Sequence, residues 1–142
     1  MTSPAIRPGQ AAEIDAFLAE RIYEYNAAVT GYRDFEPFGA TRLSEAGSIE
    51  AGVSGFTWGG CCYVAYLWVA PELRGNGVGS ELLSIAEQLA RSKGCRLMVL
   101  SSHSFQAPGF YTRKGYEQVA QIVDYPVGHS DFFLAKRLAS MS

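Results

Sequence analysis

Charge is sparse in this sequence, and basic charge is not concentrated anywhere along it. Charged residues make up 18% of the 142 positions, the formal net charge is -2, and the Lys and Arg residues are scattered. A surface dedicated to nucleic acid needs clustered positive charge, because phosphate contacts supply most of its affinity. We therefore expect no nucleic-acid partner.

Long apolar runs are absent as well. No stretch approaches the roughly 20 apolar residues needed to span a bilayer. The opening segment, MTSPAIRPGQ, lacks the apolar core of a signal peptide. These two absences predict a protein with no membrane contact and a cytoplasmic location.

Cysteine is scarce, and its placement argues against two kinds of site. Cys61, Cys62 and Cys95 cannot form a disulfide framework, and no CxxC pair meets a second pair of metal ligands. Strand alternation would place Cys61 and Cys62 on opposite faces, and no neighbouring histidine activates either thiol. We interpret all three as reduced, buried, small apolar residues, and we expect no metal site.

Apolar residues, by contrast, make up 48% of the chain, which is enough to bury a core. The length suits one compact domain, so we predict a single domain over residues 1–142. Strands that alternate with helices after a run of hairpins indicate a mixed α/β sheet. Apolar spacing and Gly or Pro signals predict helix 10–28, strands 35–43, 49–58 and 61–69, helix 77–93, strand 96–100, short helix 108–114, and strands 116–124 and 131–136.

A glycine-rich turn follows the strand 61–69 and opens the helix 77–93 with the sequence Pro-Glu-Leu-Arg-Gly-Asn-Gly-Val-Gly. The first backbone N–H groups of a helix have no intrahelical partner and lie at the positive end of its dipole. Glycines let an anion approach this backbone closely, and Arg74 adds a guanidinium, so the turn can bind a pyrophosphate. The competing interpretation is a plain turn into a helix, with glycines that serve tight geometry only.

Two common phosphate-binding motifs do not fit this turn. A P-loop needs Gly-x-x-x-x-Gly-Lys-Ser/Thr, and the turn contains no lysine. The dinucleotide fingerprint Gly-x-Gly-x-x-Gly also fails, because Ser80 stands three residues after Gly77 and Leu82 three residues after Gly79. The turn must therefore belong to another class of anion site if it binds an anion.

The spacing Arg-x-x-Gly-x-Gly at Arg74, Gly77 and Gly79, behind a strand ending Leu-x-Val-x-Pro, resembles the acetyl-CoA signature of the GNAT acetyltransferase superfamily. A second block, 104–116, resembles the family pattern Asn-x-x-Ala-x-x-Phe-Tyr-x-x-x-Gly-Phe/Tyr. The two blocks stand in the family's order and separation, and with the flanking strands they cover roughly residues 53–138. The chain therefore resembles a small, single-domain, bacterial-type GNAT protein.

The resemblance implies a mixed, mostly antiparallel central sheet flanked by helices, with the central strands 61–69 and 96–101 splayed apart. The pantetheine arm of acetyl-CoA would lie in the gap and pair with backbone groups of Leu67 and Val69. Ser104 replaces the family's usual Asn, and it keeps a donor and an acceptor for the cofactor arm. The pyrophosphate would bind Arg74, Gly75, Asn76, Gly77, Val78, Gly79 and Ser80.

The resemblance also suggests which residues transfer the protons. Tyr111 aligns with a family tyrosine beside the thioester sulfur, so we expect it to protonate or hydrogen-bond the leaving thiolate. The competing interpretation of Tyr111 is a core aromatic beside Phe110. For the base we take His103 as the candidate residue, with His129, Glu50 and a base acting through water as alternatives.

The function implied is an N-acetyltransferase that moves an acetyl group from acetyl-CoA to a primary amine by direct attack. The alternative is a non-catalytic acyl-CoA-binding module with a regulatory role. We expect a small-molecule or peptide amine as the acceptor, and a homodimer stays open. The acceptor pocket should use the first helix, the loop after it and the chain's end, with Tyr23, Tyr25, Asn26, Tyr32, Asp34 and Glu36 as candidates.

Overall fold

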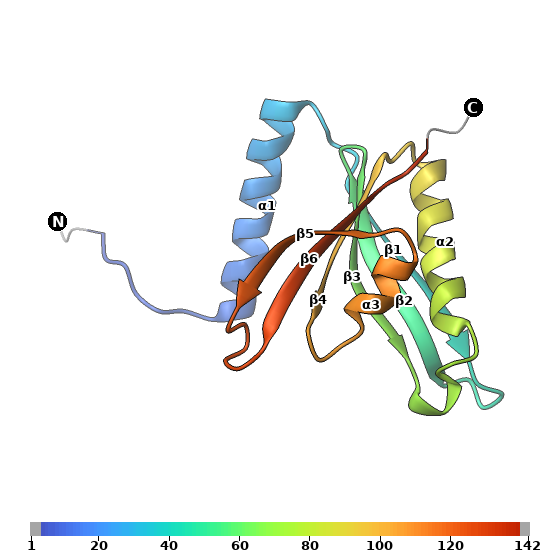
Figure 1. Ribbon diagram of the computed structural model, residues 1–142. Coiled ribbons are helices and arrows are strands. Elements are labelled where there is room, and N and C mark those ends of the chain that lie inside the picture. Colours follow the sequence, from blue (N-terminus) through green and yellow to red (C-terminus); the bar gives the residue numbers. More distant parts are fainter. Residues whose placement is uncertain (1–3, 140–142) are drawn as a thin grey trace. The chain divides into compact units, whose positions relative to one another are not determined.

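The computed structural model describes residues 4–139 (Figure 1). These residues form two compact units that meet in the sequence between Arg33 and Asp34. The first unit contains one helix, and the second contains the sheet with its helices. The single domain expected over residues 1–142 stays a prediction, and each unit is described by itself.

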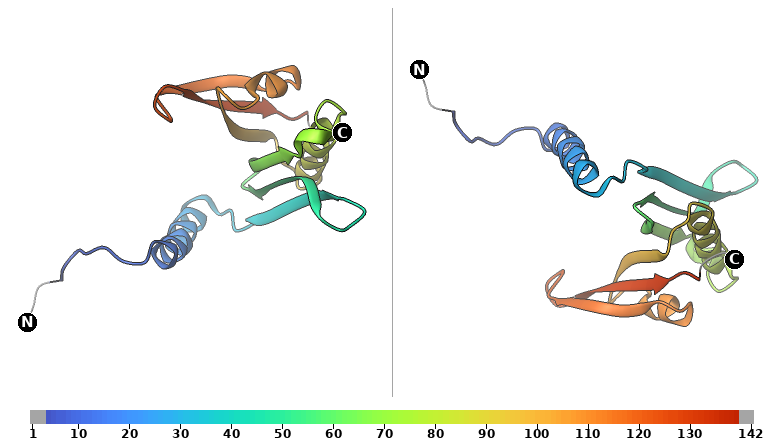
Figure 2. Two further views of the ribbon diagram at one scale, coloured as in Figure 1. Left: turned by 90° about the horizontal axis from the view of Figure 1, so that it is seen from below. Right: turned by 90° about the horizontal axis from the view of Figure 1, so that it is seen from above.

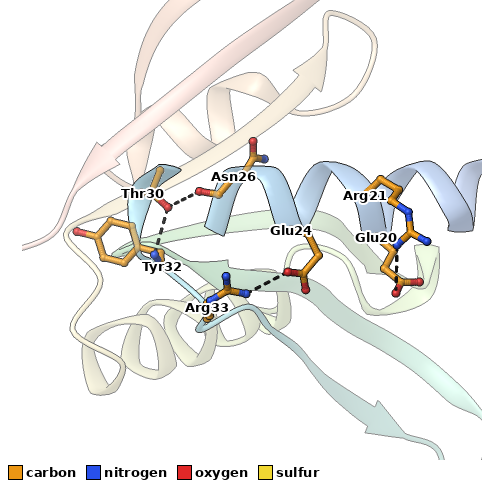
Figure 3. Close-up of polar contacts among 7 residues, drawn as sticks. All are labelled: Glu20, Arg21, Glu24, Asn26, Thr30, Tyr32 and Arg33. Atoms are coloured by element: carbon orange, nitrogen blue, oxygen red, sulfur yellow. Dashed lines mark hydrogen bonds and ion pairs between the residues drawn. The ribbon is translucent and has the colours of Figure 1, made fainter. Parts of the chain in front are cut away.

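The first unit is built on the helix α1 (Ala11–Thr30), close to the predicted range 10–28. The helix ends because Gly31 adopts a left-handed conformation, with φ of 81°, which glycine accepts without a steric penalty. The Thr30 hydroxyl donates to the carbonyl oxygen of Asn26 at 2.7 Å and accepts from the backbone N–H of Tyr32 at 3.1 Å (Figure 3). These bonds fix the exit of the chain from the helix.

The second unit is a six-stranded sheet in the order β1-β2-β3-β4-β6-β5. All neighbouring strands pair antiparallel except β3 and β4, which are parallel, so the predicted mixed and mostly antiparallel sheet is confirmed. Its elements are β1 (Glu36–Leu43), β2 (Ile49–Trp58), β3 (Cys61–Val69), the 3₁₀ turn η1 (Pro71–Leu73), α2 (Val78–Ser92), β4 (Leu97–His103), α3 (Pro108–Arg113), β5 (Glu117–Val123) and β6 (Ser130–Arg137).

One boundary differs from the sequence prediction in a way that matters for the site. The strand expected to end at residue 100 continues as β4 to His103, so His103 lies in the strand and not beyond it. The physical reason is the partner strand: β6 stays paired with β4 up to the pair His103–Asp131. Local sequence around His103 carries no sign of a partner 28 residues away, so propensity alone ended the strand too early.

The two central strands separate along their length. β3 pairs with β4 only over Cys61–Tyr63 and Leu97–Val99, whereas β4 remains paired with β6 along its whole length. Beyond these residues, the edge of β3 that faces β4 has no neighbouring strand among the described residues. Figure 2 shows the β1–β2 hairpin and the β5–β6 hairpin on either side of this junction. The splayed central strands that the resemblance implied are thus confirmed.

A bulge changes which face each residue of β3 presents. Tyr66 pairs with Ser54 and Val64 pairs with Gly55, so Ala65 is an extra residue on β3. Side chains alternate along a regular strand, and one extra residue reverses the alternation beyond it. The faces of β3 before and after Ala65 are therefore exchanged relative to a simple alternating strand.

The consequence is that the second half of β3 directs aliphatic side chains at the core and aromatic ones away from it. Val64 is buried, and Leu67 and Val69 pack against the same buried cluster. Tyr66 and Trp68 lie on the opposite face and are exposed at 76% and 50%. Without the bulge, Tyr66 and Trp68 would share the buried face of Val64.

The core lies between the sheet and α2, which contacts β1, β2 and β3. Its fully buried side chains include Leu83 from α2, Met98 and Leu100 from β4, and Leu134 from β6. The buried polar side chains of the described residues include Glu87 of α2, whose carboxylate is discussed next. No helix within residues 4–139 is both long and apolar enough to span a membrane.

Glu87 connects α2 to β6 through side-chain hydrogen bonds. Its carboxylate accepts a hydrogen bond from the Tyr116 hydroxyl at 2.8 Å and another from the Lys136 ammonium at 2.9 Å. Burial, followed by the hydrogen bond to Glu87, raises the pKa of Tyr116 well above its usual range. Because both oxygens of the carboxylate are bonded, this buried cluster is satisfied, and it joins α2 to β6 and to the segment before β5.

Candidate active site

A cavity of about 940 Å³ opens where β3 and β4 separate. Its volume lies at the upper end of the range typical of small-molecule and cofactor sites. Its wall includes the turn before α2 and part of α3. The wall is formed by residues 64–69, 73–75, 77–80, 100–102, 105–107, 110, 111 and 113.

The turn before α2 leaves backbone donors facing this cavity. Gly75 and Gly77 adopt left-handed conformations with φ of 81° and 82°, which explains why glycine stands at both positions. Gly77 begins α2 without any side-chain cap hydrogen bond. The N–H groups of the first helical turn therefore have no intrahelical partner and lie at the positive end of the dipole. This geometry is suited to binding an anion.

Two predicted residues of the turn use their side chains to build it. The Arg74 Nε donates to the carbonyl oxygen of Val69 at 2.9 Å, which fixes the turn to the end of β3. The Asn76 side-chain amide donates to the carbonyl oxygen of Leu73 at 3.1 Å, and Asn76 is not part of the cavity wall. The remaining turn residues predicted to bind the pyrophosphate all lie on the wall.

The edge of β3 that faces the gap supplies further backbone groups. Ala70 donates its N–H to the carbonyl oxygen of Glu50 at 2.9 Å, so Ala70 faces β2. Backbone groups point alternately to the two sides of a strand, which turns those of Leu67 and Val69 toward the gap. Both residues lie on the cavity wall, as the resemblance implied.

Ser104 has a different environment from the one expected. Its backbone N–H donates to the carbonyl oxygen of Ser130 at 2.8 Å, and its hydroxyl accepts from the Ser130 N–H at 3.1 Å. Ser104 therefore closes the end of β4 onto β6, and it is not part of the cavity wall. The wall beside it is formed by Phe105 and Gln106, which the sequence analysis did not single out although both lie in the second motif block.

Tyr111 lies on the cavity wall, in α3. Its ring makes edge contacts with Phe110 and Tyr116, with centroid distances of 5.1 and 5.8 Å. Among residues 4–139, no protein group forms a hydrogen bond with its hydroxyl, which leaves that proton available to a bound molecule. Burial raises the pKa of Tyr111, so the phenol stays protonated across the neutral range.

His103 is not part of the cavity wall, and it contacts the wall through the ring of Phe105. Its ring stacks on Phe105, a wall residue, at 5.3 Å with an interplanar angle of 6°, and on Tyr125 at 5.7 Å with an angle of 14°. His129 contacts the edge of the same Phe105 ring at 5.0 Å. The third candidate base, Glu50, instead forms an ion pair with an arginine of β1 at 2.9 Å. His103 and His129 thus gather around one wall residue, and Glu50 does not join them.

Two of the acidic residues suggested for the acceptor pocket lie elsewhere on the sheet. Asp34 accepts a hydrogen bond from the N–H of Gly59, at the turn between β2 and β3. Glu36 pairs with Lys93, which directly follows the C-terminal end of α2. Neither is part of the cavity wall. The other candidates belong to the first unit or to its exit, and their role stays a prediction.

The thiols do not contribute to the site. Burial raises the pKa of Cys62 to about 12, and burial also raises the pKa of Cys95. Since only the thiolate is a good nucleophile, these two groups are inert near neutral pH. Cys61, Cys62 and Cys95 are all outside the cavity wall. Within residues 4–139, no cluster of three or more His, Cys, Asp or Glu side chains could hold a metal ion.

Comparison with known proteins gives consistent matches. A family model described as "Acetyltransferase (GNAT) family" matches residues 7–116. The chain is 38% identical over 107 residues to the blasticidin-S acetyltransferase of Streptomyces morookaense, which covers 75% of this chain and 79% of that protein. It is 29% identical over 126 residues to an acetyltransferase of Agrobacterium fabrum, which covers 89% of this chain and 92% of that protein. The crystal structure of an acetyltransferase from Bacillus cereus ATCC 14579 superposes with a TM-score of 0.83 at 35% identity, covering 95% of this chain and 98% of that one.

Proposed function

Because this chain belongs to the GNAT acetyltransferase family and is an acetyl-CoA-dependent acetyltransferase, we propose that it acetylates a primary amine of a small molecule. The observation that carries this proposal is one cavity whose wall includes both the uncapped first turn of α2 and Tyr111, whose hydroxyl has no protein partner among the described residues. The name of the Streptomyces relative, blasticidin-S acetyltransferase, favours a small molecule over a peptide as the acceptor.

The residues of the cavity fit the chemistry of acetyl-CoA. The uncapped first turn of α2 would bind the pyrophosphate, with Arg74 and Arg113 as cations on the same wall. The backbone groups of Leu67 and Val69 would pair with the amides of the pantetheine arm, as a strand pairs with a neighbour. Arg74 already donates to Val69, so the Val69 N–H and both groups of Leu67 are the ones left for the arm.

The transfer needs two proton movements, and we assign one to His103, which contacts the wall residue Phe105, and the other to Tyr111 on the wall itself. A primary amine arrives mostly as ammonium at neutral pH, so His103 would take one proton through its ring nitrogen, directly or through a water. The amine nitrogen then forms a bond to the acetyl carbon while the carbon–sulfur bond breaks. The second amine proton replaces the one that Tyr111 gives to the leaving thiolate, so the products are the acetamide, free coenzyme A and one proton released to solvent.

Tyr111 is suited to a late proton transfer or to a strong hydrogen bond. A phenol with a reference pKa near 10 is a weaker acid than a thiol near 8.5, and burial raises the pKa of Tyr111 further. Full proton transfer ahead of bond cleavage is therefore uphill. Donation to sulfur as charge develops there lowers the barrier without that cost.

The test is a screen of primary amines with acetyl-CoA as donor, using coenzyme A release and product mass as readouts. Each amine is paired with the alcohol of the same carbon skeleton. We expect saturable release with a subset of amines and a product heavier by one acetyl group. Release with the alcohols and not with the amines would replace the proposed N-acetylation by O-acetylation.

A further inference from the structure

A buried carboxylate lies directly behind the candidate base. Asp131, at the start of β6, is only 4% exposed, and its Oδ1 has no hydrogen-bond partner among the described residues. In the β4–β6 ladder Asp131 stands opposite His103, so their side chains project from the same face. The His103 Nδ1 lies 3.6 Å from this oxygen. The imidazole is thus the basic group that lies within 4 Å of the orphaned oxygen among the described residues.

A second contact decides which ring nitrogen carries the proton. The His103 Nδ1 lies 2.9 Å from the carbonyl oxygen of Tyr125. A carbonyl oxygen can only accept, so this contact is a hydrogen bond only when Nδ1 is protonated. The carboxylate of Asp131, on the same side, favours the same tautomer. In the neutral ring the lone pair is then on Nε2, which has no protein partner among residues 4–139.

The ring is also held in orientation by its neighbours. The rings of Phe105 and Tyr125 stack nearly parallel on the imidazole. The backbone N–H of His103 donates to the side-chain oxygen of Gln106 at 2.7 Å. The groups around the ring are Asp131 from β6, Tyr125 from the loop between β5 and β6, and Phe105 from the loop after β4. His129, from the same loop as Tyr125, contacts Phe105. Asp131 is the one anion of this set, so it stabilises the imidazolium that forms when Nε2 accepts a proton.

We propose that Asp131 is the positioning residue of the acetyl transfer: together with the Tyr125 carbonyl it holds His103 with the proton on Nδ1 and leaves Nε2 as the proton acceptor. This inference rests on the proposed function. A buried carboxylate oxygen without a partner costs free energy, and the gain here is the stabilised imidazolium. In the triads of serine hydrolases, an aspartate likewise fixes the tautomer of a histidine and stabilises its imidazolium, on folds unrelated to this one.

The first experiment reads the tautomer without any turnover. The chain has two histidines, so the ring nitrogens can be assigned in ¹⁵N-labelled protein by comparison with His129→Gln. We expect the neutral His103 ring to carry its proton on Nδ1. A ring with the proton on Nε2 overturns the proposal, because Nε2 could then no longer accept one.

The second experiment compares two carboxylate-to-amide changes in the same hairpin. Asp131→Asn removes the charge behind His103 and should lower kcat about 10- to 100-fold, less than the roughly 100- to 10000-fold contributed by a general base itself, while KM for acetyl-CoA stays unchanged. Asp124→Asn is the control, because Asp124 only accepts a hydrogen bond from the Gly128 N–H and asparagine keeps that acceptor. It should leave kcat within about twofold, as a surface substitution does.

The outcomes of these experiments distinguish the role of Asp131 from the proposed acetylation of an amine. If wild-type protein acetylates an amine and Asp131→Asn keeps its kcat, the role of Asp131 is refuted while the proposed function stands. If no amine of the screen is acetylated, the proposed function fails. The tautomer of His103 in wild-type protein still decides the positioning claim if Asp131→Asn does not fold.

Discussion

Tyr111 is the residue whose side chain can be tested with the smallest change. Tyr111→Phe keeps the ring that contacts Phe110 and Tyr116 and removes only the hydroxyl. If the phenol serves the leaving thiolate, kcat should fall by about 10- to 10000-fold. The melting temperature and the affinity for acetyl-CoA should change little, because the ring still fills its space. Steady-state kinetics and thermal unfolding measure both quantities on one sample.

Tyr116 provides the matched control for this change. It is also a buried tyrosine and packs against Tyr111, but its hydroxyl is bonded to the buried carboxylate of Glu87. Tyr116→Phe leaves that oxygen with one donor fewer, so it should lower stability by about 1–3 kcal/mol and leave kcat per folded molecule unchanged. Unchanged kcat in Tyr111→Phe would remove the phenol from the mechanism and leave it as a packing residue.

At the residue scale, the predicted residues that depend on local geometry lie on the cavity wall, and their roles stay predictions. Gly77 and Gly79 belong to a turn and Tyr111 to a short helix, and both elements are marked in the local sequence. Asp131 could not be found in this way. Its partnership with His103 exists only through the register of β4 with β6, and register is set by the whole sheet.

At the scale of elements, the bulge in β3 depends on Gly55 of β2. A Cβ atom at Gly55 would lie 2.0 Å from the carbonyl oxygen of Tyr63, closer than any real contact. Because the obstacle is backbone, Gly55→Ala should force the two strands apart and cost about 1–3 kcal/mol or more. The same shift moves Leu67 on the gap-facing edge, so KM for acetyl-CoA should rise. Chemical unfolding and kinetics test both effects.

Gly39→Ala on β1 is the control for this prediction. A Cβ there would meet only the carbonyl oxygen of Val53, at 3.7 Å, which is an ordinary contact. Stability should therefore stay within about 0.5 kcal/mol of wild type, and KM should not move. Equal behaviour of the two alanine variants would show that the bulge does not require glycine at position 55.

Most elements could be placed from sequence because their ends are marked by glycine or proline. Gly59 and Gly60 join β2 to β3, and Pro108 begins α3 at its first turn. The bulge at Ala65 was missed because the residues around it form one uninterrupted apolar run, Val-Ala-Tyr-Leu-Trp-Val. Such a run carries no alternation whose reversal could be detected.

At the scale of the whole molecule, the cavity is a product of incomplete pairing in the sheet. β3 and β4 are parallel neighbours for three residue pairs, and the rest of each strand is held by its other neighbour. The sheet can therefore open without loss of order on either side. No pattern in the sequence shows how far two strands stay paired, and it was the family resemblance that implied this opening.

The buried thiol of Cys62 makes a prediction for the stability of the whole fold. Burial raises its pKa from 9.0 to about 12, so the folded protein keeps the proton when the unfolded chain has lost it. Below pH 9 the contribution to stability is fully present, and it is lost as the pH rises toward 12. One unit above the ordinary pKa of the thiol, the loss amounts to about 1.4 kcal/mol.

Urea unfolding at about pH 8, 9 and 10 can isolate this loss when wild type is compared with Cys62→Ala. Groups that do not contact Cys62 titrate equally in both proteins, so the difference between their unfolding free energies should shrink by about 1.4 kcal/mol over this range. Val64→Ala is the control, because it removes buried volume on the same face of β3 and carries no titrating group. Its difference from wild type should be the same at each pH. A difference for Cys62→Ala that stays constant from pH 8 to 10 would mean that the thiol ionises as easily in the folded protein as in the unfolded chain, and that its burial is not the barrier to a thiolate.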